Sequence, residues 1–318
     1  GMGCVYPAQV KTIANQLEAK GLSWKGYMED MKTGCRHPDL GSADHTQSAE
    51  VGDQYAGRHN PFIYFHSIID TPACRANVVP LPKLFADLRT VATTPNFSFI
   101  TPNLCDDAHD ATCAGKNYEG KNNQGGLYAA DRFLRKVIPQ IQASPAYQRD
   151  GLIIVTLDES GDIGTPAGAT SCCAEPTGPN TPAPGQVGPG GGRIGTVVVS
   201  KRFVRPGTVS DVPYNHYSLL RSLEDLYRIG ATTTIPGSDG RGHLGYAGAA
   251  GLVPFGKDVY DVAAATAAPP RAQRPSSGGQ LAATGLPALL PAAALLLMAA
   301  MLRALRRRRR GPAATAAG

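Results

Sequence analysis

The fold class is decided by residues 127–159, LYAADRFLRKVIPQIQASPAYQRDGLIIVTLDE. In the first part, LYAADRFLRKVIPQI, apolar residues recur at the spacing of an amphipathic helix. The end of the stretch, GLIIVTLDE, is a continuous apolar run that predicts a buried strand. A helix followed by a buried strand is one unit of an α/β fold.

The same alternation continues on both sides of this stretch. The pattern predicts further helices over residues 10–21, 81–91 and 215–230, and further strands over residues 22–29, 97–103 and 193–200. We therefore expect an α/β fold with a mostly parallel sheet flanked by helices. In such sheets, binding and catalytic groups gather at the carboxyl ends of the strands.

The positive charge of the chain lies in its C-terminal tail. The formal charge is +6, from 31 basic and 25 acidic residues. Eight basic residues and no acidic ones follow Asp261, which leaves residues 1–262 with 23 basic and 25 acidic groups, a net charge of about −2. The main domain therefore has no basic excess for binding nucleic acid, and we expect no nucleic-acid partner.

The tail has the features of a surface anchor. Residues 286–302 are seventeen uncharged, mostly apolar residues, and an arginine cluster that follows them predicts a cytoplasmic flank with the main domain outside the cell. The preceding LAATG, residues 281–285, resembles the wall-sorting signal read by sortases, which would cut between Thr284 and Gly285 and link the protein to peptidoglycan. The alternative is a plain membrane anchor, with LAATG occurring by chance.

These features divide the chain into three parts. Residues 1–262 form the main domain, residues 263–280 an Ala/Pro/Gly-rich linker, and residues 281–318 the sorting-like signal, the hydrophobic segment and the arginine-rich tail. The start, GMGCVYP, is not a signal peptide, so we expect the sequence to lack its beginning.

The seven cysteines favour an exported protein, because thiols outside the cytoplasm tend to pair. We expect a disulfide between Cys105 and Cys113 and, as a second hypothesis, one between Cys4 and Cys35. We expect the adjacent Cys172 and Cys173 not to pair with each other, because such a bond would be strained.

Acidic residues and histidines mark a candidate site. Asp158 and Glu159 follow a buried strand, where two neighbouring carboxylates are costly unless a divalent cation compensates them. The alternative is that Asp158 caps a turn and Glu159 points into solvent. Strand 97–103 leads into a second group, in which His109 lies among Asp106, Asp107 and Asp110.

His109 suits either a metal ligand or a protonated group that contacts a phosphoryl oxygen, the alternative being a solvated acidic loop. His59, in GRHNPFIYFHSI, precedes a strand-like run and is a better site candidate than His66, for which a surface position is expected.

Five segments together resemble successive blocks of the bacterial phosphoesterase family, over about residues 4–250. They are KTIANQLEAKGLSWKGYMEDM, GRHNPFIYFHSI, TPNLCDDAHD, IIVTLDE and YNHYSLLRSLEDLYRIGA followed by HLGYA. That family includes secreted acid phosphatases, phosphatidylinositol phosphatases and phospholipases C, and belongs to the alkaline-phosphatase superfamily. The resemblance implies an alkaline-phosphatase-like α/β fold and hydrolysis of phosphate esters.

The resemblance also implies roles for individual residues. The family's late metal pair falls on Asp158 and Glu159, which would hold Mg²⁺, Ca²⁺ or Mn²⁺, and the histidines of its phosphate pocket fall on His59 and His109. His216 matches a family position too. We expect it instead to hold its own turn at the start of a helix that Asn215 caps, outside the catalytic set.

Two blocks usual in the family are missing: an ENHS-like strand with metal ligands, and a THPSxPNY-like block with the nucleophile. The nucleophile is therefore unknown and expected upstream of Gly1, so the chain is either truncated or inactive as it stands. Three functions remain: an acid-phosphatase-like phosphomonoesterase at the cell surface, acting on phosphoinositides or small phosphate esters; a phospholipase C; and a wall-anchored scaffold without activity.

Overall fold

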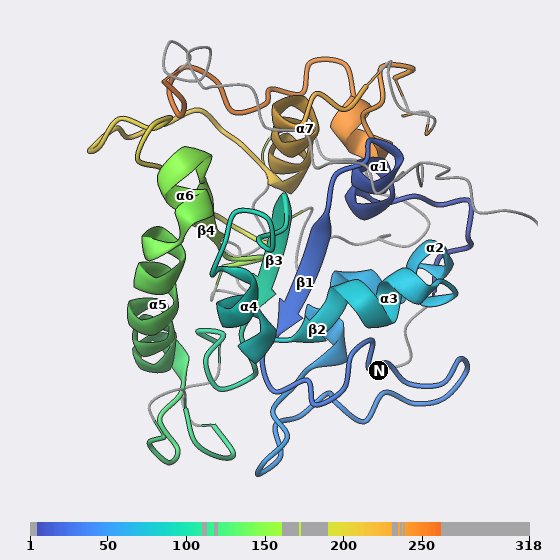
Figure 1. The fold of residues 1–318 in the computed structure, drawn as a ribbon, viewed down its shortest axis with the longest axis vertical. Helices are drawn as coiled ribbons and strands as arrows, with labels where there is room; N and C mark the ends of the chain where they lie inside the picture. Colours follow the sequence, from blue (N-terminus) through green and yellow to red (C-terminus); the bar gives the residue numbers. More distant parts are fainter. Residues whose placement is uncertain are drawn as a thin grey trace, which may run out of the picture. The chain divides into compact units, whose positions relative to one another are not determined.

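A parallel sheet lies at the centre of the fold (Figure 1). The computed structural model describes residues 5–109, 113–117, 120–160, 172, 190–230, 235, 237 and 239–261. Strand β1 (Trp24–Met28) pairs in parallel with β2 (Val78–Pro80) on one side and with β3 (Phe97–Thr101) on the other. The strand order is β2-β1-β3, which confirms the predicted parallel sheet.

Helices cover both faces of this sheet. Successive residues of β1 point to opposite sides, so the strand contributes to a buried cluster on each face. Trp24 and Met28 pack in one buried cluster with Leu17 of α1 (Ile13–Ala19). Tyr27 packs in a second cluster with residues of α4 (Pro82–Asp87) and α5 (Gly126–Ala143). The protein is therefore an α/β fold with a flanked parallel sheet, consistent with an alkaline-phosphatase-like architecture.

Local signals fix the ends of the helices. Thr12 forms a capping box at the start of α1, and Gly21 after its end has φ +70°, which a residue with a side chain adopts only at a cost. Helix α7 (His216–Leu226) begins with the capping box of Asn215, as predicted. Short elements that the sequence did not predict are β2, α2 (His66–Ile69), α3 (Pro72–Asn77) and α6 (Pro145–Asp150).

Two predicted strands differ in the structure. The run after His59 is not a strand but a 3₁₀ helix, Pro61–Tyr64, and His59 itself ends a preceding 3₁₀ helix, Gly57–His59. Pro61 fixes φ near the helical value, and the side chain of Asn60 accepts a hydrogen bond from the Phe62 N–H at 3.3 Å, so a turn is favoured here. The strand of GLIIVTLDE is shorter than predicted.

That strand, β4 (Ile153–Thr156), pairs antiparallel with β5 (Thr196–Val199), with Ile153 opposite Val199. Only Ile153 of β4 is buried. The expectation of a fully buried strand was wrong, because its described partner is a single strand with two exposed residues.

Two disulfides stabilise loops near the sheet. Cys105 bonds to Cys113, as predicted, and Cys35 bonds to Cys74, with Cα–Cα distances of 4.7 and 5.2 Å. The Cys4–Cys35 hypothesis was wrong. The backbone N–H of Cys35 donates to the Val78 carbonyl at 2.9 Å, which places Cys35 beside α3 and its Cys74. Cys172 is also in a disulfide, whereas Cys4 and Cys173 lie outside the described residues.

The predicted linker and anchor, residues 263–280 and 281–318, with Thr284 and Gly285, lie outside the described residues. Within the described part of the chain, no helix is long and apolar enough to cross a membrane.

Candidate functional site

The site lies where β1 and β3 end. Glu29 follows β1, and its backbone N–H donates to the Thr101 carbonyl at 3.0 Å. Its side-chain Oε2 accepts from the Asn103 N–H at 2.9 Å. These two bonds hold the ends of both strands together, so the segments after them leave the sheet at the same edge.

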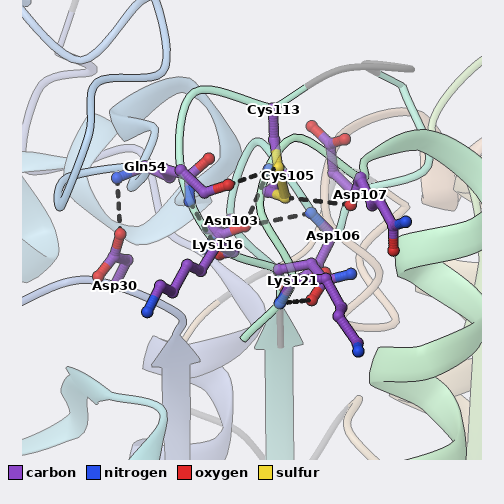
Figure 2. Close-up of a disulfide and its surroundings, with 12 residues drawn as sticks. Asp30, Gln54, Asn103, Cys105, Asp106, Asp107, Cys113, Lys116 and Lys121 are labelled. Atoms are coloured by element: carbon purple, nitrogen blue, oxygen red, sulfur yellow. Dashed lines mark hydrogen bonds between the residues drawn. A yellow bond between two sulfur atoms is a disulfide. The ribbon is translucent and has the colours of Figure 1, made fainter. Parts of the chain in front are cut away.

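Hydrogen bonds within the loop after β3 fix its conformation. The side-chain oxygen of Asn103 accepts from the N–H groups of Cys105 and Asp106, at 2.9 and 3.1 Å. Asp107 Oδ1 accepts from the His109 N–H at 2.9 Å. Figure 2 shows this loop around the Cys105–Cys113 disulfide, with Asp106 and Asp107 labelled beside it. His109 is thus held by a hydrogen-bonded loop and not by a strand.

His59 lies next to this loop. Its Nδ1 is 4.0 Å from Asp107 Oδ2, and its side chain is 24% exposed. Burial and the positive charge of Arg58 lower the pKa of His59, and the negative charges of Asp107 and Asp158 oppose them. The charge of His109 also acts on His59. His59 therefore lies within electrostatic reach of both acidic segments and of the second histidine.

Asp158 and Glu159 follow β4, and both are exposed. Partial burial and the neighbouring Asp158 raise the pKa of Glu159, whereas His109 lowers it. Because Asp158 acts on His59 and His109 acts on Glu159, the structure brings the four predicted site residues close enough to interact through their charges. Asp110 lies outside the described residues.

The geometry supports the predicted metal site only in part. Two adjacent carboxylates repel each other, and their oxygens are ligands that hard divalent cations prefer. However, the described residues contain no group of three or more His, Cys, Asp or Glu side chains that could hold a metal ion. Asp158 Oδ1 also accepts from the Glu159 N–H at 3.1 Å, as in the turn-capping alternative. The described residues thus supply two carboxylates and not a complete site.

His216 has a contact that the sequence analysis did not predict. Its Nε2 is 2.8 Å from the Asp158 carbonyl oxygen, and because that oxygen only accepts, Nε2 carries the proton. Asn215 caps α7 and His216 is its first residue, as expected. The side chain of His216 additionally connects the start of α7 to the acidic pair. The sequence did contain a signal for this contact, because His216 stands at the start of a helix that another residue, Asn215, caps.

Glu29 was missed by the sequence reasoning. Burial and the neighbouring Asp106 raise the pKa of Glu29 well above the ordinary range of a carboxyl group. A signal was present, because Glu29 and Asp30 are two acids at the end of a buried strand, the same pattern as Asp158 and Glu159.

A flanked parallel sheet with histidines and carboxylates at its carboxyl edge defines an α/β protein with a polar site at the ends of its strands. Residues 3–230 match the model of the Phosphoesterase family, and the chain belongs to that family.

Curated relatives agree with this assignment. The chain is 28% identical to a phosphate-repressible acid phosphatase of Penicillium chrysogenum over 68% of this chain and 42% of the relative. It is 23% identical to a probable acid phosphatase of Kluyveromyces lactis over 69% and 42%. It is 24% identical to a phosphatidylinositol-3-phosphatase of Mycobacterium tuberculosis over 69% and 54%. The chain therefore spans about two fifths to one half of the length of these relatives.

Proposed function

We propose that this chain is part of a phosphoric ester hydrolase of the acid-phosphatase type, which acts on phosphomonoesters. The observation that carries the proposal is the position of His59, which lies 4.0 Å from Asp107 and interacts with the charges of Asp158 and His109. The named relatives and the family support the same chemistry.

In the proposed mechanism, His59 and His109 act on the phosphate group. A protonated imidazole donates to a non-bridging phosphoryl oxygen or gives its proton to the leaving alkoxide. Asp107 orients both groups, since one of its oxygens accepts from the His109 backbone and the other faces His59. His216 positions the main chain of Asp158.

We propose that Asp158 and Glu159 contribute two carboxylates to a divalent cation, Mg²⁺, Ca²⁺ or Mn²⁺. Such an ion would neutralise charge on the phosphoryl oxygens when bound. Because the described residues do not complete its coordination, no step is assigned to the ion, and no described residue is assigned as the nucleophile.

Metal binding can be tested without activity. Asp158→Asn removes one of the two carboxylates, so the affinity for Mn²⁺ in calorimetry should fall by about tenfold or more. Asp131→Asn, which removes an exposed carboxylate on α5, is the matched control and should bind as the original chain does. Equal affinity in all three proteins would contradict the assignment.

The substrate class is tested by comparing p-nitrophenyl phosphate, vesicles that contain phosphatidylinositol phosphates, and phosphatidylcholine vesicles. Release of inorganic phosphate from either of the first two supports a phosphomonoesterase, and the second would extend it to phosphoinositides. Cleavage of phosphatidylcholine would support a phospholipase C instead. Inactivity on all three, also for a version extended upstream, would favour a scaffold.

In a version extended upstream, His59→Asn should lower kcat/KM for p-nitrophenyl phosphate by about 10²-fold or more, because general acid–base groups contribute about 10²–10⁴. His66→Asn is the control, since His66 pairs with Asp70 at the surface, and it should keep its activity. Similar losses in both variants would contradict a catalytic role for His59.

The proposal places the enzyme at the outer face of the cell, anchored to the wall or membrane through residues 281–318. The order of LAATG, apolar segment and arginine tail supports this location.

A further inference from the structure

The first turn of helix α5 presents two large apolar side chains to solvent. Leu127 is 76% exposed and Tyr128 is 48% exposed. The opposite face of the helix is buried in the core through Ala129, Phe133 and Val137. Single exposed apolar residues are ordinary on a protein surface, but two consecutive ones at the start of a long helix form a local apolar patch.

Basic side chains accompany this apolar pair on the helix. The guanidinium of Arg132 lies 5.4 Å from the centre of the Tyr128 ring. Arg135 and Lys136 follow on the next turn, and both are exposed. The exposed face of α5 is therefore apolar in its first turn and basic after it.

The loop that leads into α5 adds two further exposed lysines, Lys116 and Lys121. Lys116 forms a β-bridge with Asn122, which holds it against the residues just before the helix. Figure 2 shows Lys116 and Lys121 on this loop. We use the name α5 patch for the apolar pair and its basic neighbours: Leu127, Tyr128, Lys116, Lys121, Arg132, Arg135 and Lys136.

The charge of this segment is opposite to that of the rest of the domain. Residues 113–136 contain five basic and two acidic residues, a net charge of +3. Of the 23 basic and 25 acidic groups in residues 1–262, this leaves 18 and 23 elsewhere, a net charge of −5. The acid on α5, Asp131, lies 3.2 Å from Arg132 and 2.8 Å from Arg135. Positive charge is thus concentrated where the apolar pair is exposed.

This combination matches the surface of an anionic lipid bilayer. Leucine and tyrosine side chains enter the boundary between headgroups and acyl chains, where tyrosine is favoured because its ring is apolar and its hydroxyl polar. Lysine and arginine reach the lipid phosphates while their apolar stems lie along the membrane. A soluble polyanion would use the basic residues but would not bury Leu127, so the apolar pair favours a lipid surface.

The α5 patch begins at the carboxyl edge of the central sheet. Asn122 and Asn123, just before α5, line a cavity together with Glu29 and Asn103, which follow β1 and β3. A membrane that contacts the start of α5 therefore faces this edge of the sheet and not the opposite one.

We propose that the α5 patch docks the protein onto anionic lipid bilayers, with Leu127 and Tyr128 inserted between the lipids and the basic residues on the lipid phosphates. This contact is separate from the predicted anchor at residues 286–302. It is also independent of the proposed hydrolysis, because a lipid without a phosphomonoester is sufficient for it.

Insertion is tested in the full chain with Leu127→Trp, since the natural Trp24 is 1% exposed and stays out of reach of the lipid. The vesicles are phosphatidylcholine with brominated acyl chains, with or without phosphatidylglycerol. Both kinds can take up residues 286–302, so the neutral vesicles control for the tail. Tryptophan emission should shift to the blue and be quenched on the anionic vesicles alone. Val209→Trp, at another position that is 82% exposed, should be quenched on neither.

The basic residues are tested in the Leu127→Trp background. Lys116→Gln and Lys121→Gln should each weaken docking about fivefold in a titration with anionic vesicles, because one basic residue near such a surface contributes about this much. Lys257→Gln changes an exposed lysine outside the α5 patch and should leave docking unchanged. Added salt should also release the tryptophan from quenching.

Several results would overturn the inference. Equal quenching on neutral and anionic vesicles would assign the contact to the tail, and quenching of Val209→Trp to the same extent would show unspecific adsorption. No quenching, or unchanged docking in both lysine variants, would exclude the α5 patch as a lipid-binding surface. Blue-shifted emission without vesicles would show that a second copy, or another part of a chain extended upstream, already covers Leu127.

Discussion

His59 is the single residue on which the proposed chemistry depends most. Burial and Arg58 lower its pKa below the ordinary value of about 6.5, and Asp107 and Asp158 compensate only in part. If protonated His59 donates to the substrate, its protonated fraction is high in acid and falls as the pH rises through this lowered pKa. We therefore expect kcat/KM to decline on the alkaline side, with an apparent pKa below about 6.5.

Arg58→Gln should move that decline to higher pH, because removing a positive neighbour favours the imidazolium. The measurement is the pH profile of kcat/KM for p-nitrophenyl phosphate. Arg89→Gln, which changes another exposed arginine, should leave the profile unmoved. A shift to lower pH in Arg58→Gln would show that His59 is not the group that titrates.

Among the elements, β1 depends on a glycine at its centre. A Cβ on Gly26 would lie 2.6 Å from the Phe62 ring, which stacks on Trp24 at a centroid distance of 4.8 Å. Gly26→Ala should therefore lower the free energy of unfolding by about 1–3 kcal/mol in urea denaturation, as overpacking in a core does. Gly195→Ala has no atom within 4 Å of the new Cβ and should change it by less than about 0.5 kcal/mol.

A smaller side chain opposite Gly26 should relieve this clash. The double variant Gly26→Ala with Phe62→Leu is expected to lose less than the sum of the two single losses, since the residues are in contact. Additive losses would show that the cost of Gly26→Ala comes from backbone effects and not from Phe62.

Near the end of α7, the buried His243 makes contacts whose stabilising effect should depend on pH. His243 is 7% exposed and lies 2.8 Å from both Asp239 and Asp225, so it joins the segment before Leu244 to this helix. Burial disfavours its charged form, but the hydrogen bonds to the two carboxylates outweigh it and raise the pKa of His243. A raised pKa means that the stabilisation is complete below about pH 6.5 and is lost as the pH rises through the folded-state value.

The loss of unfolding free energy in His243→Gln should accordingly be about 1–2 kcal/mol at pH 5 and smaller at pH 9. Thermal or urea unfolding at both pH values measures it. His66→Gln removes the exposed pair with Asp70 and should cost much less, because surface pairs contribute little. A larger loss at pH 9 than at pH 5 would contradict the assignment.

The sequence predicted the elements whose signals are local. Helix α5 follows its own apolar spacing, and α1 and α7 their capping residues, so their places were predictable. Strand β2 has three residues and ends at Pro80, too few for a pattern. The antiparallel pairing of β4 with β5 joins residues 40 to 46 positions apart in the chain and leaves no local sequence signal.

The same distinction applies to the site. Strand ends and the family resemblance identified His59, His109, Asp158 and Glu159 as candidates. The proximity of Glu29 to Asp106, and of His216 to the Asp158 carbonyl, depends on which segments meet in space. These contacts could be known only from the fold.

At the scale of the whole molecule, the excess of positive charge is confined to the C-terminal tail. Residues 1–262 are slightly acidic, and the arginine cluster comes after the apolar residues 286–302. This order is what an anchor needs, because basic residues stay on the cytoplasmic side of an apolar segment. It does not distinguish a permanent membrane anchor from a sorting signal that a sortase removes, since both share these features.

The residue that separates the two is Thr284, because a sortase would cut between it and Gly285. Thr284→Ala should leave the protein in the membrane fraction, whereas the original chain should be linked to peptidoglycan and released only by digestion of the wall. Thr266→Ala, which changes another threonine of the C-terminal region, should remain wall-linked. Wall linkage that survives Thr284→Ala would exclude sorting at LAATG, and membrane association of the original chain would favour the plain anchor.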